Sequence, residues 1–182
     1  MPPSAPPPPR YHRVAIALHW VLAAALVGSF GVGVYMHELA LSPLQLRLYN
    51  WHKWAGITIL ALSAVRLAWR VTHPPPPDVA MPRWQQRAAH LTHGLMYGLF
   101  FAVPLAGWAY SSAAGFPVVV FGVLPLPDFV PADQALADAL KPWHATLAFA
   151  LAGLVLLHVG AAIKHHVVDR DGLLGRMWPA RR

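Results

Sequence analysis

Four histidines near the ends of long apolar segments are the residues of this chain best suited to metal chemistry. They are His19, His52, His144 and His158. His144 and His158 are 14 residues apart, which on an α-helix is a rotation of about 1400°, close to four turns, and a rise of about 21 Å. One histidine therefore lies in each half of a bilayer whose apolar core is about 30 Å thick. Ionisable side chains at such depth are costly and usually functional, so the spacing predicts two metal centres, one per leaflet.

The composition indicates a single-domain membrane protein. Of the 182 residues, 57% are hydrophobic and 12% are charged, whereas soluble domains average about 45–50% apolar and about 25% charged residues. The net charge of +7 could suggest nucleic acid, but the basic residues flank apolar segments and form no continuous stripe, so nucleic-acid binding is not expected. The absence of cysteine excludes disulfides, thiolate metal sites and covalently attached c-type haem.

Four apolar segments are long enough to span a bilayer as helices. They cover residues 14–36, 49–69, 88–110 and 143–167. Pro104 should kink the third helix. The connection from Ser111 to Pro142 contains VVVFGVL, too short to span, and ADQALADALK (132–141), which we predict to be a short amphipathic helix outside the core. The predicted fold class is all-α, an integral membrane four-helix bundle.

The basic residues predict the orientation of this bundle. Eleven of the 14 lysines and arginines would lie on one side and three, Arg47, Lys53 and Lys141, on the other. Cytoplasmic loops are enriched in Lys and Arg, so both termini are predicted to be cytoplasmic, which agrees with an even number of spans. We expect the membrane domain to cover residues 11–179, between a disordered proline-rich leader (1–10) and a basic tail (180–182).

This topology sorts the histidines into two pairs by depth. His19 and His158 would lie in the cytoplasmic half, and His52 and His144 would open their helices on the other side. Each pair could bind one haem iron axially between the helices, because neutral imidazole is a good iron ligand. Two non-covalent b haems are therefore predicted, whereas a closed zinc site would need four ligands at one level. Four glycines could allow the backbone to approach a flat macrocycle closely, or could only let neighbouring helices pack. They are Gly28, Gly31, Gly56 and Gly153.

Further charged or ionisable residues are candidates for contacts with haem propionates, quinone or an electron donor. Arg66 follows His52 by 14 residues, so it could bind a propionate of the inner haem; a positive-inside anchor is the alternative. His93 could replace an inner ligand, bind a propionate, line a quinone pocket or only pack. Lys53 and Lys141 flank the outer histidines and could attract an anionic donor or the outer propionates, or could snorkel to the interface.

Four stretches of the chain carry a resemblance to a known family. They are ALHWVLAAALV around His19, NWHKWAGITILALSAVRL around His52, HLTHGLMYGLFFAVPLAGW in the third segment, and WHATLAFALAGLVLLHVGAA around His144 and His158. Residues 11–179 resemble the bacterial cytochrome b561 family of di-haem, four-helix membrane proteins. The paired-histidine helix is also shared by membrane subunits of hydrogenases and formate dehydrogenases. The resemblance implies the same four histidine ligands, exchange of electrons with membrane quinone and, in some members, oxidation of periplasmic superoxide.

The predicted function is one-electron transfer across the bacterial inner membrane through two bis-histidine b haems. The donor would be periplasmic, such as superoxide or a redox partner protein, and the acceptor would be ubiquinone or another quinone in the surrounding lipid. The chain would then be an electron-transfer oxidoreductase of the superoxide:quinone type, without a catalytic side chain of its own. The alternative is a haem-bearing membrane anchor for a larger dehydrogenase or hydrogenase-like complex. Ion transport is disfavoured because the apolar segments contain no buried carboxylate.

Overall fold

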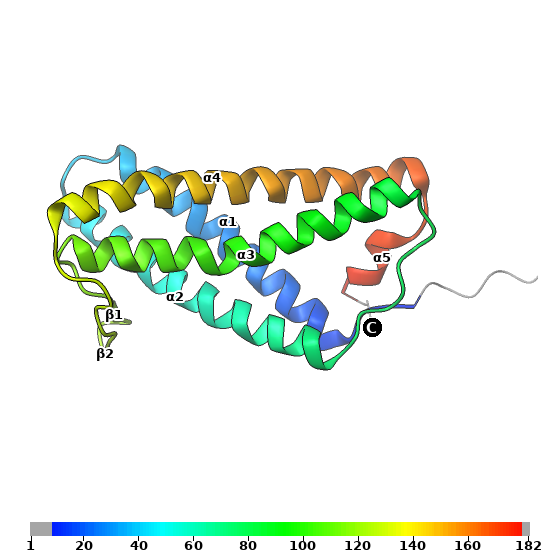
Figure 1. Cartoon of the computed structure of the whole chain (residues 1–182), viewed down its shortest axis with the longest axis horizontal. Coiled ribbons are helices and arrows are strands. Elements are labelled where there is room, and N and C mark those ends of the chain that lie inside the picture. The colour runs from blue at the N-terminus through cyan, green and yellow to red at the C-terminus, as the bar shows by residue number, and fades with distance from the viewer. Residues whose placement is uncertain (1–8, 180–182) are drawn as a thin grey trace, which may run out of the picture.

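The computed structural model describes residues 9–179. Figure 1 shows an elongated bundle of four long helices. These are α1 (Arg13–Glu38), α2 (Pro43–Thr72), α3 (Arg83–Ala113) and α4 (Gln134–Lys164). A small antiparallel hairpin, β1 (Val119–Val120) and β2 (Leu124–Pro125), lies between α3 and α4 at one end of the bundle, the hairpin end. A π-helical turn (His165–Asp169) and α5 (Leu173–Met177) follow α4 at the other end, the termini end.

All four long helices have the length and composition needed to cross a membrane. An 18-residue stretch within each has a mean hydropathy of 1.9 in α1, 1.3 in α2, 1.2 in α3 and 2.2 in α4 with its π-helical turn. Large apolar side chains point outward as well as inward; Val27 is 66% exposed and Leu156 is 73% exposed. A helix that is apolar on all sides is typical of a membrane span. The predicted all-α membrane bundle is thus confirmed.

α4 begins earlier than predicted. Asp133 caps the helix by accepting a hydrogen bond from the N–H of Leu136, and the helix continues from Gln134 through Pro142. The prediction of a separate amphipathic helix at 132–141 is therefore wrong, because most of this segment forms the first turns of α4. A proline inside a helix removes the hydrogen bond to the carbonyl four residues earlier, and here that residue is Asp138, which is exposed to solvent.

The short apolar run in the α3–α4 connection forms the hairpin. Val119 pairs with Pro125 and Val120 with Leu124, and the turn passes through Phe121 and Gly122 at φ values of 52° and 73°. Lys53 Nζ donates to the carbonyls of the loop before β1, and Trp54 Nε1 donates to the Val119 carbonyl at 2.6 Å. These contacts hold the hairpin against α2.

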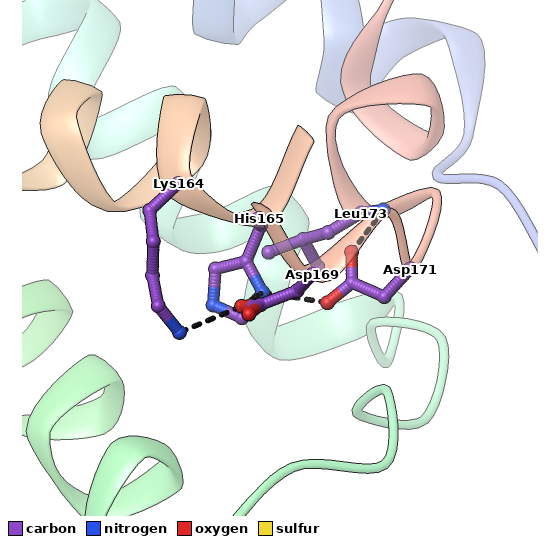
Figure 2. Close-up of polar contacts among 5 residues, drawn as sticks. All are labelled: Lys164, His165, Asp169, Asp171 and Leu173. Carbon is purple, nitrogen blue, oxygen red and sulfur yellow. Dashed lines mark hydrogen bonds and ion pairs between the residues drawn. The ribbon is translucent and has the colours of Figure 1, made fainter. Parts of the chain in front are cut away.

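An ion-pair network lies at the C-terminal end of α4 (Figure 2). His165 Nδ1 lies 3.1 Å from Asp169 Oδ2 and 2.5 Å from Asp171 Oδ2, and Lys164 Nζ donates to Asp169 Oδ2 at 2.7 Å. The second carboxylate oxygen of Asp171 accepts from the N–H of Leu173 at 3.0 Å, at the start of α5. The network therefore joins the end of α4 to α5.

The N-terminal segment and α5 hold one another at the termini end. The Arg176 side chain donates to the carbonyls of Pro9 at 2.9 Å and Pro77 at 2.7 Å, and this residue is only 2% exposed. The N–H of Tyr11 donates to the Arg176 carbonyl, and Arg10 donates to the carbonyl of Trp178. Pro9 and Arg10, the end of the predicted leader, are thus attached to the bundle, while the rest of that leader (1–8) and the tail 180–182 lie outside the described residues.

Candidate functional site

His52 and His144 face one another at the hairpin end. Their ring centres are 6.0 Å apart and the ring planes are inclined by 82°. His52 Nδ1 lies 3.0 Å from the Ser29 carbonyl oxygen, and His144 Nδ1 lies 3.0 Å from the Val103 carbonyl oxygen. Because a carbonyl only accepts, each Nδ1 is the donor and each Nε2 remains free. Metal-binding histidines are held in this way, with the second ring nitrogen donating to a carbonyl or carboxylate.

A glycine beside each of these rings permits the close approach. A Cβ atom at Gly33 would lie 3.0 Å from His52 Cε1, and one at Gly107 would lie 2.9 Å from His144 Cε1. These two glycines are missing from the sequence-based candidates. The glycines predicted to allow close approach were Gly28, Gly31, Gly56 and Gly153. An added Cβ at any of these four would meet nothing within 4 Å.

His19, His93 and His158 come together at the termini end. The ring centres of His19 and His158 are 6.2 Å apart, and those of His93 and His158 are 5.2 Å apart. Arg66 Nη1 lies 3.0 Å from His19 Nδ1, and Arg66 Nε donates to the Tyr97 hydroxyl at 3.1 Å. Since a guanidinium only donates, His19 Nδ1 accepts in this arrangement. Tyr97 is a further site residue that the sequence alone did not indicate.

Each long helix supplies one residue to each of two levels. The two residues are 14 positions apart in every case: His19 and Gly33 on α1, Arg66 and His52 on α2, His93 and Gly107 on α3, His158 and His144 on α4. Fourteen residues rise about 21 Å, so the levels are well separated. An apolar cluster lies between them and is formed by Leu22, Ile59, Met96, Phe100 and Leu151.

The spacing of the paired rings matches two imidazoles on one metal ion. Metal–nitrogen bonds of about 2.0 Å, with about 1.1 Å from nitrogen to ring centre, allow the centres to lie up to about 6.2 Å apart. The two pairs have separations of 6.0 Å and 6.2 Å. The residues present therefore fit a metal group held by two imidazoles.

Lys53 and Lys141 lie near the hairpin-end pair but differ in their contacts. Lys53 Nζ lies 3.4 Å from the Phe116 carbonyl and 3.3 Å from the Pro117 carbonyl, whereas Lys141 is exposed. The same end of the bundle also carries four carboxylates, those of Glu38, Asp128, Asp133 and Asp138. Positive charge at this end is therefore local to the two lysines and to Arg47, near the start of α2, and is not spread over it.

Comparison with known proteins identifies the family of this chain. The model of the prokaryotic cytochrome b561 family matches residues 10–180. The chain belongs to this family. It is 34% identical over 175 residues to cytochrome b561 homolog 2 of Escherichia coli (strain K12), an alignment that covers 93% of this chain and 92% of that protein. It is 31% identical over 174 residues to the probable superoxide oxidase CybB of Yersinia pestis, with 95% and 98% of the two chains covered.

Membership of the cytochrome b561 family confirms the resemblance seen in the sequence. The protein is a multi-pass bacterial membrane protein and a b-type cytochrome that acts in electron transfer. Its family implies b-type haem as the cofactor. In this cytochrome b561, the groups that could hold haem iron are the pairs His52 with His144 and His19 with His158.

Proposed function

We propose that this cytochrome b561 holds two haem b groups, one between His52 and His144 and one between His19 and His158. The observation that carries the proposal is the separation of the paired rings, 6.0 Å and 6.2 Å. At the hairpin end, the carbonyls of Ser29 and Val103 orient the imidazoles before the cofactor binds. Haem would supply a one-electron redox centre at iron, and two axial imidazoles would leave no position there for substrate.

The termini-end pair needs a local rearrangement. His19 can bind iron through Nε2 only with its proton on Nδ1, so Arg66 must release that nitrogen. The freed guanidinium would then be available to a haem propionate, which it can bind in bidentate fashion. The ring centres of His93 and His158 are 5.2 Å apart, closer than those of the proposed pairs, and we assign His93 a contact with a propionate or with quinone.

We further propose that electrons enter at the hairpin end from superoxide and leave to a quinone in the bilayer. The printed name of the Yersinia pestis relative supports superoxide as the donor. Lys53 and Lys141 place positive charge near His52 and His144, which favours an anionic donor. Eleven of 14 basic residues are assigned to the termini side, so the positive-inside rule places this side in the cytoplasm and the hairpin end in the periplasm of the inner membrane.

Haem quantitation on the purified protein tests the ligand assignment. We expect two haem b per chain and a b-type reduced-minus-oxidised spectrum. His52→Ala or His144→Ala should remove one haem, and His19→Ala or His158→Ala the other. A matched control is the exposed residue His90, whose side chain hydrogen-bonds Asp78, so that His90→Ala should retain both haems. Absence of a b-type signal, or loss of haem in His93→Ala but not in His19→Ala, would contradict the assignment.

A separate assay tests the donor and the acceptor. The haem-loaded protein in liposomes with ubiquinone should be reduced by an enzymatic source of superoxide and reoxidised only when quinone is present. Failure of superoxide to reduce a protein with two haems would refute the donor and leave the ligand assignment intact. Stable co-purification with a soluble dehydrogenase subunit would support the anchor function instead.

A further inference from the structure

A cationic cavity of about 480 Å³ opens at the termini end. It lies between the start of α1, the end of α2, the proline-rich loop that follows α2, and the end of α5. Three arginines and two histidines line it, and none of its lining residues in the described part of the chain is acidic. The basic residues are Arg10, Arg66, Arg70, His12 and His73.

Within residues 9–179, the arginines of this cavity have no carboxylate partner. Arg66 contacts His19 and Tyr97, Arg10 donates to the Trp178 carbonyl, and the Arg70 guanidinium lies over the Tyr97 ring at 5.9 Å from its centre. Ion pairs within residues 9–179 are formed by histidines and a lysine. Three like charges around one cavity repel one another, so an anion that enters it is stabilised; where a haem propionate takes Arg66, as proposed above, Arg10 and Arg70 remain for that anion.

Apolar and aromatic side chains form much of the remaining wall. Trp69, Tyr97, Ala15 and Met177 contribute to it, and the Trp69 ring stacks on His73 with ring centres 3.8 Å apart. The cavity is at the ends of membrane-spanning helices, where aromatic and basic residues meet the interface. We propose that this cavity binds the phosphate headgroup of an anionic phospholipid, with the start of its apolar chains against Trp69 and Tyr97.

Other ligands account for fewer of these features. A haem propionate would engage Arg66, which contacts His19. It would not account for Arg70, which lies one helical turn farther toward the membrane surface, or for Arg10, which lies before the start of α1. A neutral quinone head would leave the arginine charges uncompensated. A free phosphate shares the headgroup chemistry but makes no use of the aromatic wall. Basic pockets between membrane helices are known sites for anionic lipid headgroups.

Native mass spectrometry of the delipidated, haem-loaded protein in detergent tests this proposal. Phosphatidylglycerol and phosphatidylcholine with the same acyl chains are titrated separately, with and without millimolar inorganic phosphate. We expect retention of one phosphatidylglycerol at least tenfold more tightly than phosphatidylcholine. One guanidinium near the interface is worth roughly fivefold in affinity, so Arg70→Gln should weaken phosphatidylglycerol binding about fivefold and the Arg10→Gln, Arg70→Gln double variant about thirtyfold. Arg70→Lys should retain most of it.

Arg87 provides the matched control, because it is an exposed arginine near the start of α3 that does not line the cavity. Arg87→Gln should bind phosphatidylglycerol as the wild type does. Equal retention of the two lipids, or equal losses in the Arg70 and Arg87 variants, would overturn the proposal. Full competition by inorganic phosphate would assign the cavity to a soluble phosphate instead. If Arg70→Gln lost haem but bound lipid as before, Arg70 would be a propionate ligand and the lipid proposal would fail. If the protein bound phosphatidylglycerol selectively but held no haem, only the proposed function would be refuted.

Discussion

Replacing Gly107 with alanine should weaken haem binding at the hairpin end and spare the termini end. The new Cβ would lie 2.9 Å from His144 Cε1 and 3.1 Å from His144 Nδ1. Unstrained carbon atoms approach to about 3.5–4.0 Å, so the imidazole must move by about 0.6–1.1 Å. That movement would stretch the 3.0 Å bond from His144 to the Val103 carbonyl beyond the usual limit of about 3.2 Å.

The expected effect is large for the cofactor and small for the fold. Loss of such a hydrogen bond behind a metal-binding histidine typically costs about 10–100-fold in affinity. Alanine is favoured over glycine within a helix by about 1 kcal/mol, so α3 itself should not be destabilised. Loss of haem without loss of the folded bundle would therefore report on the position of the His144 ring.

The assay is haem per chain at a limiting haem supply, measured beside thermal unfolding. Gly107→Ala should fall from two haems toward one, and Gly33→Ala should do the same through His52, whose Cε1 lies 3.0 Å from the added Cβ. Gly98→Ala is the control on α3, because nothing lies within 4 Å of its added Cβ. If Gly107→Ala bound two haems with wild-type affinity, the argument that the Val103 carbonyl orients a ligand would be refuted.

Three further predictions concern charged residues. Arg66→Gln should lower the midpoint potential of one haem by an amount on the order of tens of millivolts, because a nearby cation favours the reduced state; redox titration measures this. Lys141→Gln should slow reduction by an anionic donor at low ionic strength and have little effect at high salt, as stopped-flow rates would show. Asp171→Ala removes the contacts with His165 and the N–H of Leu173, so α5 should become more sensitive to limited proteolysis, with an unchanged spectrum.

The spans and the depth of each histidine could be predicted from the sequence because both depend on local geometry. Hydropathy and length identify a membrane helix, and a spacing of 14 residues places His144 and His158 on one face whatever surrounds them. The start of α4 could not be predicted in this way. Pro142 reads as a helix breaker, but its missing hydrogen bond falls at the exposed Asp138, so the helix continues through it.

The glycines that contact the histidines depend on tertiary structure. Gly31 and Gly33 are two positions apart on α1, and only the packing of α2 shows that the His52 ring lies against Gly33. A signal was nevertheless present, since Gly33 and Gly107 follow His19 and His93 by the same 14 residues that separate His144 from His158. A search for a glycine 14 residues after each histidine would have found both.

The two levels also differ in how far they are prepared for a cofactor. At the hairpin end, backbone carbonyls already fix the protons of both histidines on Nδ1. At the termini end, the Arg66 guanidinium holds His19 in the opposite tautomer, and His93 lies beside His158. A backbone carbonyl cannot leave its helix, whereas an arginine side chain can rotate away. The backbone therefore orients the ligands proposed at the hairpin end, whereas those proposed at the termini end depend on a side-chain movement that would free a cation for the propionates.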